Sequence, residues 1–585
     1  MHTLTTEQEE FYAAEGKVVL CACPGSGKTY VVARKLLSYI QTWQYSQQGV
    51  AVLSFTNVAS QEIEKQAKEL MDDGFKIEHP HFVGTIDSFI NTFILLRFGY
   101  LMNKEVSKRP TIVINNIFKF PYKYWRTECH RQGCIEGIHE FRWDINGNLY
   151  RKKERVTCST STYGTPCNQY KKMLLNKGYV FQNEVAALSY RLLKKYPEIS
   201  KAIAARFPII IIDETQDTST EQMAVLDLLT EAGMSSVFLV GDPDQSIYEW
   251  RSATPECFLD KIKAKEWKTI YLTKNFRSSQ LICNATQAFA NSLANKPPST
   301  AAGSCAMYGQ KPVLILYNDQ VEESAIIKNF IELCQANSIT EANSDIAVVT
   351  RGRIHSNTDV QSLWKSIEIE LLAQSAYEWY HGSRKKAFEL CEKALFNMAI
   401  KELRDIDITI AAEIESIMVY DTWKKWVIST LCSFPSPQKP LNSWVTELKN
   451  ILVTLFDQLK ITLREGIVIG EVIKIKTRDK KIPYFKDIPL KNYFEAKSQK
   501  EIITSSVHGV KGETFDSTLL LVRNKTGANT LTPNFLNNGD LNDELMRIAY
   551  VAMTRPKKLL VVAMPNIKKQ KHKRFPTDKW EYIYI

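Results

Sequence analysis

A short segment near the start of the chain combines an apolar run, small residues, a lysine and a threonine. The apolar run is Val18–Cys21, and the residues after it are Ala22, Cys23, Pro24, Gly25, Ser26, Gly27, Lys28 and Thr29. Glycines allow backbone amides to close around phosphates, and a helix that begins here adds positive potential. The lysine would reach the β and γ phosphates, and the threonine hydroxyl would bind Mg²⁺. The segment predicts a site for ATP and Mg²⁺, although Ala22 stands where the usual pattern has glycine; the alternative is a chance turn.

A second segment places adjacent acids directly after another apolar run. The run ends at Ile212, and Asp213, Glu214, Thr215, Gln216 and Asp217 follow it. At the carboxyl end of a parallel strand, such side chains point into a nucleotide crevice. Asp213 would hold Mg²⁺ through water, and Glu214 would orient and deprotonate the attacking water. Together with the phosphate loop, this segment indicates a nucleoside triphosphatase rather than a solvated acidic turn.

The elements that must position these residues are predicted from further apolar runs. They are Val18–Cys21, Val50–Phe55, Pro208–Ile212, Val237–Val240, Ile270–Leu272, Val313–Leu316, Ile346–Val349, Leu519–Val522 and Leu559–Val562. Segments with helical spacing separate many of them. Runs that are apolar on both faces are typical of parallel strands buried beneath helices. The predicted fold class is therefore α/β.

Two long stretches interrupt this alternation, and we interpret both as insertions. Residues 101–180 contain 15 Lys and Arg against 6 Asp and Glu, interleaved with aromatic residues. Residues 355–498 have mainly helical spacing and end in a basic segment, Lys474–Lys481. Cations that follow phosphates and rings that stack on bases would suit single-stranded nucleic acid. The alternative is a solvated face with aromatic residues in the core.

Composition excludes several classes of protein. The chain has 585 residues, with 44% hydrophobic and 24% charged residues, as in ordinary soluble proteins of several domains. Met1–Glu15 is polar and acidic, unlike a signal peptide, so we expect a cytoplasmic protein without a membrane partner. The net charge of +11 permits a polyanionic partner.

The 12 cysteines are scattered, which predicts reduced thiols. Four of them cluster in the first insertion, near His130 and His139. They are Cys129, Cys134, Cys158 and Cys167. Only the first pair has a usual ligand spacing, so free thiols are the main alternative to a zinc site.

Several segments together resemble a known family. Asp213–Asp217 and Val240–Arg251 look like motifs II and III of superfamily 1A DNA helicases, the family of UvrD, Rep and PcrA. The other matches follow in the family's order. Leu4–Gln8 resembles the Q motif, Ser54–Asn57 motif Ia, Gly84–Phe89 motif Ib, Leu272–Ser278 motif IV, His508–Asp516 motif V and Glu544–Arg555 motif VI. The resemblance covers nearly the whole chain and implies two RecA-like P-loop motor domains, each with a mainly helical insertion.

The resemblance also implies roles for individual residues around ATP. Gln8 would contact the adenine and Phe276 would stack on it. Arg277 and Arg555 would reach the γ-phosphate from the second motor domain. Gln245 would link that phosphate to the DNA-facing loop. The catalytic set is then Lys28, Asp213, Glu214, Gln245, Arg277 and Arg555, and Gly512 joins the nucleotide-binding set.

The DNA-contacting positions follow from the same motifs. They are Thr56, Asn57, Thr85, Tyr248, Trp250, Arg251 and His508. The chain departs from the family pattern at two places. Asp87 stands where motif Ib usually has histidine, which removes a DNA donor. In motif V, Glu513 directly follows Gly512, and Thr514 occupies the usual position of the acid.

The family arrangement predicts six parts of the chain. Motor domain 1A spans 1–97 and 186–268 around insertion 1B at 98–185, and motor domain 2A spans 269–354 and 499–585 around insertion 2B at 355–498. Insertion 2B is shorter than that of full-size relatives. Smaller UvrD-like ATPases of bacterial defence systems, including the helicase-like subunit of Gabija systems, share such compact insertions.

The expected function is that of an ATP-dependent 3′-5′ translocase and helicase on single-stranded DNA and its junctions with duplex. The alternative is a DNA-stimulated ATPase that serves as sensor or effector in an antiphage complex with an OLD-like partner nuclease. A metabolite kinase is disfavoured, because it would not need Arg277 and Arg555. No nuclease motif is evident in the sequence.

Overall fold

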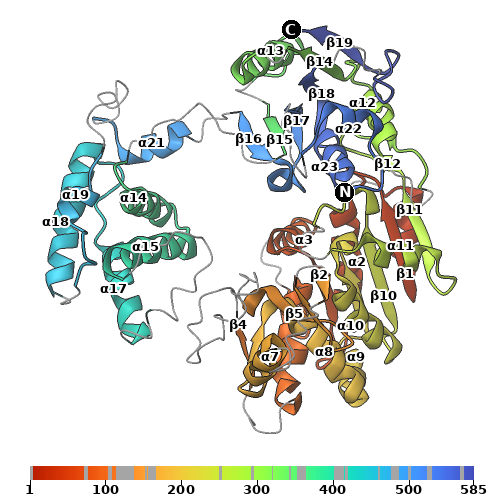
Figure 1. Ribbon diagram of the computed structural model, residues 1–585, viewed down its shortest axis with the longest axis horizontal. Coiled ribbons are helices and arrows are strands. Elements are labelled where there is room, and N and C mark those ends of the chain that lie inside the picture. Colours follow the sequence, from red (N-terminus) through yellow and green to blue (C-terminus); the bar gives the residue numbers. More distant parts are fainter. Residues whose placement is uncertain are drawn as a thin grey trace. The chain divides into compact units, whose positions relative to one another are not determined.

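The computed structural model divides the chain into two compact units, residues 1–354 with 502–585 and residues 355–501 (Figure 1). The structure describes residues 4–71, 77–102, 109–113, 138–151, 154–155, 166–248, 253–290, 296–318, 320–340, 344–351, 364–400, 414, 419–458, 462–475, 487–497, 502–523, 530–566 and 572–585. Each unit is described by itself below.

The first unit contains a six-stranded parallel sheet with the order β11-β1-β10-β9-β2-β3. Its strands are β1 (Lys17–Ala22), β2 (Val50–Ser54), β3 (Phe82–Thr85), β9 (Ile209–Ile212), β10 (Ser236–Gly241) and β11 (Lys268–Leu272). Alternate residues of β1 enter separate cores, Val19 on one side and Val18 and Leu20 on the other. Because both faces are covered, the strands are apolar throughout.

Helices connect these strands and cover the sheet. They are α1 (Thr6–Ala13), α2 (Lys28–Ile40), α3 (Asn57–Glu69), α4 (Ile86–Phe89), α5 (Leu96–Phe98), α8 (Val185–Lys195), α9 (Pro197–Arg206), α10 (Thr220–Glu231) and α11 (Pro255–Lys263). A π-helical turn, Ile90–Leu95, lies between α4 and α5.

A second six-stranded parallel sheet in the same unit has the order β16-β15-β17-β18-β14-β19. Its strands are β14 (Val313–Tyr317), β15 (Ile346–Thr350), β16 (Ile503–Ser506), β17 (Phe515–Leu521), β18 (Pro556–Pro565) and β19 (Glu581–Tyr584). Its helices are α12 (Gln280–Thr286), α13 (Glu323–Ala336), α22 (Pro533–Asn538) and α23 (Glu544–Met553). Between the two sheets in sequence, β12 (Lys274–Asn275) pairs with β13 (Thr300–Ala301).

The nine apolar runs are strands, so the α/β class is confirmed. Sequence patterning missed β3, β16 and β19. All three lie at the edges of their sheets and are only partly buried, so they lack a continuous apolar run.

The described residues of the first insertion contain short strands that the sequence did not predict. β4 (Thr111–Val113) pairs with β8 (Tyr179–Phe181), and α7 (Pro166–Asn176) contacts β8. β5 (Phe141–Trp143), β6 (Leu149–Arg151) and β7 (Glu154–Arg155) form a small antiparallel sheet. Phe141 and Trp143 are buried in the hydrophobic core. These two rings therefore pack inside the protein and do not stack on bases.

The second unit is built from helices around its own core. They are α14 (Ile367–Tyr380), α15 (Arg384–Ala399), α17 (Tyr420–Cys432), α18 (Leu441–Gln458), α19 (Ile469–Val472) and α21 (Leu490–Lys497). Four buried tryptophans, Trp364, Trp423, Trp426 and Trp444, are part of this core. In the part of the chain that the structure describes, no helix is long and apolar enough to cross a membrane.

Candidate nucleotide and nucleic-acid site

The phosphate loop joins β1 to α2 through two glycines with positive φ. Gly25 has φ 71° and Gly27 has φ 78°, a left-handed conformation that glycine adopts without strain. A Cβ atom on Gly25 would lie 2.5 Å from Asn275 Oδ1. The Phe276 amide donates a hydrogen bond to the Gly25 carbonyl at 2.8 Å. The segment that follows β12 therefore packs directly against the loop.

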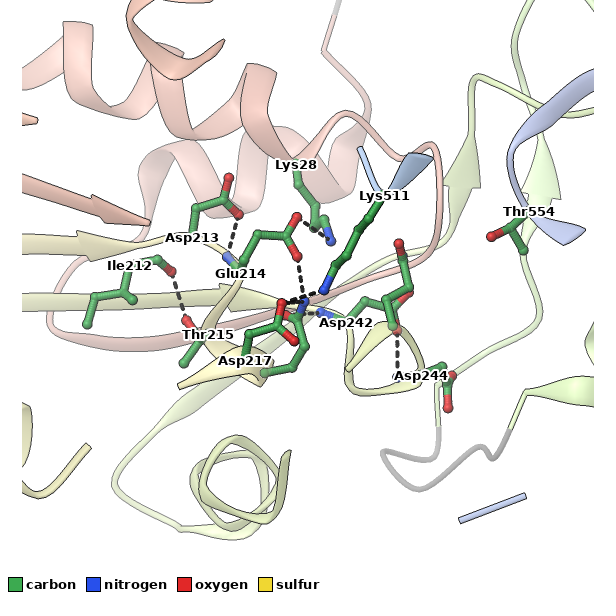
Figure 2. Close-up of polar contacts among 12 residues, drawn as sticks. Lys28, Ile212, Asp213, Glu214, Thr215, Asp217, Asp242, Asp244, Lys511 and Thr554 are labelled. Carbon is green, nitrogen blue, oxygen red and sulfur yellow. Dashed lines mark hydrogen bonds and ion pairs between the residues drawn. The ribbon is translucent and has the colours of Figure 1, made fainter. Parts of the chain in front are cut away.

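Two buried polar atoms of this loop have no hydrogen-bond partner among the described residues, Ser26 Oγ and Lys28 Nζ. The Lys28 ammonium lies 3.5 Å from Glu214 Oε1 (Figure 2). Burial opposes its charge, but the carboxylates of Glu214, Asp242 and Asp213 raise the pKa of Lys28. The Ser26 hydroxyl, the Lys28 ammonium, a left-handed loop and a helix N-terminus fit the phosphates of a nucleotide. Thr29 lies in the first turn of α2.

The pKa values of the two adjacent acids after β9, Asp213 and Glu214, are shifted in opposite directions. Asp213 Oδ1 accepts a hydrogen bond from the Glu214 amide at 2.9 Å. Burial and the neighbouring Glu214 raise the pKa of Asp213 to about 7. For Glu214, Lys28 and Lys511 outweigh burial and lower its pKa to about 2. Glu214 also has φ 53°, an unfavourable conformation for a residue with a side chain, which concentrates strain at this acid.

A chain of hydrogen bonds continues from Glu214 to the loop after β10. Gln216 Nε2 donates to Glu214 Oε2, and Gln216 Oε1 accepts from the Asp242 amide at 3.0 Å. Gln245 Nε2 donates to Asp242 Oδ2 at 2.6 Å. A Cβ atom on Gly241 would lie 2.5 Å from Gln216 Oε1, so a larger residue here would displace the Gln216 amide from this chain.

Two arginines, Arg555 directly before β18 and Arg277 directly after β12 and Phe276, extend toward this network. Arg555 Nη2 donates to Gln245 Oε1 at 3.0 Å, and its Nε donates to the Val551 carbonyl at 2.9 Å. Burial lowers the pKa of Arg555 to about 10, so it remains charged at neutral pH. Arg277 Nη1 donates to the Thr554 carbonyl at 3.1 Å. The structure thus places the partly buried Arg277 and Glu214 near the buried pair of Gln245 and Arg555.

Helix α1 is hydrogen-bonded to the phosphate loop through Gln8. Gln8 Nε2 donates to the Ser26 carbonyl at 3.2 Å, and Gln8 Oε1 accepts from the Thr5 amide at 3.1 Å. The neighbouring Glu7 carboxylate accepts hydrogen bonds from the amide and hydroxyl of Thr273. Phe276 is 40% exposed, so its ring is open to a ligand. Gly512 lies in an exposed turn, where a Cβ atom would meet nothing within 4 Å.

The candidate DNA-contacting residues of motifs Ia and Ib lie side by side. β2 and β3 are adjacent, with Ser54 opposite Thr85. Thr56 caps α3 by accepting from the Ala59 amide at 3.2 Å, and Thr85 caps α4 by accepting from the Ser88 amide at 3.1 Å. Asn57 is exposed at the start of α3.

Asp87, which replaces the family's histidine, accepts a hydrogen bond from Gln222 Nε2 at 2.7 Å. Gln222 lies in the first turn of α10, the helix that follows the acidic segment. The aspartate at this position is therefore hydrogen-bonded within the protein.

An aromatic cluster connects the acids to this surface. The Tyr248 ring lies 5.0 Å from the Phe55 ring and 5.7 Å from the His508 ring. His508 Nε2 donates to the Ile247 carbonyl at 3.0 Å, and burial lowers the pKa of His508, so the ring is neutral. Lys511 Nζ lies 4.7 Å from the Tyr248 ring centroid and pairs with Asp217. Burial raises the pKa of Asp217 to about 6 against the effect of Lys511.

Some predicted site residues lie outside the described residues. They are Trp250 and Arg251 of the DNA-contacting set and Cys129, Cys134 and Cys158 of the zinc hypothesis. Within the described ranges, no group of three or more His, Cys, Asp and Glu side chains could hold a metal ion. Thr29 and Asp213 are the residues that could hold Mg²⁺, Asp213 through water.

Sequence reasoning missed three residues of the cluster: Glu7, Asp242 and Lys296. Asp242 follows the apolar strand β10, a placement that could have marked it. Lys296 forms buried ion pairs with Asp242 and Asp244, but nothing in its local sequence distinguishes it from a surface lysine.

Comparison with family models decides the relationship. The UvrD/REP helicase N-terminal domain matches residues 4–266, and the UvrD-like helicase C-terminal domain matches residues 270–382 and 463–566. The chain belongs to the UvrD/Rep family of superfamily 1A helicases. The resemblance inferred from the motifs is thereby confirmed.

Two relatives illustrate the distance within this family. An ATP-dependent DNA helicase PcrA of Staphylococcus aureus is 25% identical over 304 residues, which are 51% of this chain and 41% of the relative. An ATP-dependent DNA helicase Rep of Buchnera aphidicola is 28% identical over 372 residues, 60% of this chain and 54% of the relative. The chain spans about half the length of the curated relatives it matches.

Proposed function

We propose that the protein is an ATP-dependent translocase and helicase that moves 3′ to 5′ along single-stranded DNA. The observation that carries this proposal is the hydrogen bond between Arg555, beside the second sheet, and Gln245, beside the first. Because the γ-phosphate would lie where these groups meet, its arrival and loss would change how the two sheets are held. Two relatives that are named ATP-dependent DNA helicases support the same activity.

The nucleotide would be held by residues of both sheets. Ser26, Lys28 and the loop amides would bind the phosphates, and Thr29 and Asp213 would hold Mg²⁺, which supplies charge neutralisation there. Gln8 would contact the adenine, and the exposed ring of Phe276 would stack on it. Arg277 and Arg555 would stabilise the charge that spreads over the transferred phosphoryl oxygens.

Glu214 would act as the general base for the attacking water. The Lys28 ammonium, 3.5 Å away, helps to keep the Glu214 carboxyl ionised. An ionised carboxylate can accept a proton from the attacking water.

Contacts between the acids and the aromatic cluster would couple hydrolysis to DNA. Asp217 pairs with Lys511, and Lys511 lies over the ring of Tyr248. A change around Glu214 would reach Tyr248 through this pair. We assign DNA contacts to Thr56, Asn57, Thr85, Tyr248, Trp250, Arg251 and His508, and extend them to the basic insertion 98–185.

We divide the motor accordingly. Motor domain 1A would comprise 1–97 and 186–268, and motor domain 2A would comprise 269–354 and 499–585. The insertions 98–185 and 355–498 would be 1B and 2B, with 2B compact.

The test is ATP turnover by the purified chain with and without single-stranded DNA, with Lys28→Ala as the blank. We expect stimulation by DNA and none in the variant, and affinity for DNA that falls steeply with salt as phosphates are neutralised. Turnover that ignores DNA would refute the proposal. DNA-stimulated turnover without strand displacement would favour a sensor or effector of an antiphage complex with a partner nuclease.

A further inference from the structure

A buried lysine, Lys296, is paired with two acids of the loop after β10. Neither of these acids is among the residues to which the family motifs assign a catalytic role. Lys296 Nζ lies 2.7 Å from Asp242 Oδ1 and 2.8 Å from Asp244 Oδ2. The lysine side chain is 6% exposed, and those of the two acids are 0% and 3% exposed. Such a closed ion triad is costly to desolvate, so its presence is weak evidence for a purely stabilising role.

Asp242 has a second partner that gives this triad a functional connection. Its Oδ2 accepts a hydrogen bond from Gln245 Nε2 at 2.6 Å. With the amide nitrogen directed at Asp242, the amide oxygen faces Arg555 Nη2, at 3.0 Å. A flipped amide would present its NH₂ group to the guanidinium, and two donors would face each other. The charge of Asp242 therefore selects the orientation in which Gln245 and Arg555 attract each other.

The segment that carries Lys296 is attached to the residues that contact the phosphate loop. It leads into β13, whose pairing partner β12 directly precedes Phe276 and Arg277. The Thr300 amide donates to the Thr273 carbonyl at 2.9 Å, and the Ala302 amide donates to the Asn275 carbonyl at 2.7 Å. Lys296 thus joins the loop after β10 to the segment that presents Arg277.

We propose that Lys296 is a positioning residue that anchors the Asp242 carboxylate and so directs Gln245 toward Arg555, which allows the pair to distinguish ATP from ADP. This inference rests on the proposed nucleotide site. Lys296 touches neither nucleotide nor DNA in this scheme; it acts through Asp242 and Gln245.

The surrounding charges agree with this role. Burial opposes the charge of Lys296, but Asp242 and Asp244 raise its pKa well above the usual value. Its other titratable neighbours are Tyr550 of α23 and Cys21 of β1. Burial raises the pKa of Tyr550, and it raises the pKa of Cys21 to about 12, so both are neutral. The same holds for Cys23, whose pKa burial also raises to about 12.

Two other cations, Lys28 and Arg555, are also attracted by the negative charge of Asp242. Both are assigned to the γ-phosphate, so neither is a fixed counter-ion for Asp242 during turnover. Lys296 is the cation in direct contact with both acids.

The test compares binding of a fluorescent non-hydrolysable ATP analogue with binding of the same fluorescent ADP. Lys296→Met keeps the apolar stem and removes the charge. We expect the preference for the ATP analogue over ADP to fall about tenfold, because a charge-assisted contact to Gln245 is no longer fixed. ADP affinity should be unchanged. Equal loss of both nucleotides, or an unchanged preference, would overturn the inference.

A second variant separates positioning from folding. Lys296→Met combined with Asp244→Asn removes one charge of each sign and leaves Asp242 with a neutral neighbour. We expect this double variant to recover part of the ATP preference, and no recovery would contradict the proposed role. Lys261→Met is the matched control, since Lys261 pairs with Asp227 at 2.6 Å outside this cluster. It should retain the wild-type preference.

Absence of ATP turnover in the wild type would instead refute the proposed function, while the binding ratio still tests Lys296.

Discussion

The candidate nucleotide cluster and the candidate DNA-contacting residues of motifs Ia and Ib are positioned in different ways. Arg555 and Gln245 are buried, and they are 310 residues apart in the chain. Thr56 and Thr85 are partly exposed, and each hydroxyl accepts from an amide three residues further on. The first set depends on the packing of both sheets, whereas the second depends on the start of a single helix.

This difference predicts how each region responds to substitution. Removing one member of a buried charge network leaves its partners without compensation, so large effects are expected. A partly exposed cap can be replaced by another capping residue with little loss. The nucleotide cluster should therefore respond in an all-or-none way and the DNA-facing residues in a graded way.

The largest effect is expected from Lys28→Ala. Its buried ammonium lies at the start of α2 and is paired here with Glu214, from which it could turn to the phosphates. DNA-stimulated ATP turnover should fall about 1,000-fold, as when a charge-stabilising donor is removed. Steady-state phosphate release measures it. Turnover near the wild-type rate would show that the phosphates bind elsewhere.

Glu214→Gln should separate binding from chemistry. The amide has nearly the same shape as the carboxylate but accepts no proton, so turnover should fall about 100-fold or more. ATP should remain bound, which filter binding with labelled nucleotide would detect. Weaker ATP binding with unchanged kcat would remove Glu214 from the role of base.

Tyr248→Ala should give an intermediate effect confined to DNA. Loss of a stacking ring costs about 1–3 kcal/mol per base, so affinity for single-stranded DNA should fall about tenfold. Fluorescence anisotropy with a labelled oligonucleotide measures the affinity, and nucleotide binding without DNA should be unchanged. Tyr248→Phe is the matched control and should bind as the wild type does. Equal binding by the Ala and Phe variants would exclude the ring from the DNA contact.

The smallest effects are expected at Thr56. Thr56→Ala should lower the free energy of unfolding by about 1 kcal/mol, because the cap of α3 is lost. Thr56→Asp keeps the cap but places a negative charge beside the phosphates, so stability should be retained while DNA affinity falls several-fold. Thermal unfolding and anisotropy measure the two quantities separately. If both variants change stability and affinity together, the cap and the DNA contact are not separable.

Much of this arrangement can be predicted from local sequence. Lys28, Asp213 and Glu214 each follow a buried strand, and parallel strands bring their carboxyl ends to one edge of a sheet. The family resemblance implies that Arg555 and Gln245 each reach the γ-phosphate, but their hydrogen bond to each other was not predicted. These residues lie at strand ends or within short motifs, where one-dimensional patterns carry the information.

Other features have no one-dimensional signal. The strain at Glu214, with φ 53°, depends on how the chain leaves β9. The contact of Lys296 with Asp242 joins residues 54 apart through a fold that places β13 beside β12. Phe141 and Trp143 sit in a basic, aromatic stretch that suggested base stacking, yet the small sheet of β5 and β6 buries them. Burial of this kind depends on tertiary packing rather than on composition.

The most direct test of 3′-5′ helicase activity is ATP-dependent strand displacement by the purified chain, comparing duplexes that carry a 3′ tail with duplexes that carry a 5′ tail. Glu214→Gln provides the blank, since it should bind ATP without turning it over. We predict displacement with the 3′ tail, none with the 5′ tail and none in the variant. Displacement from the 5′ tail alone, or displacement that persists in Glu214→Gln, would contradict the account.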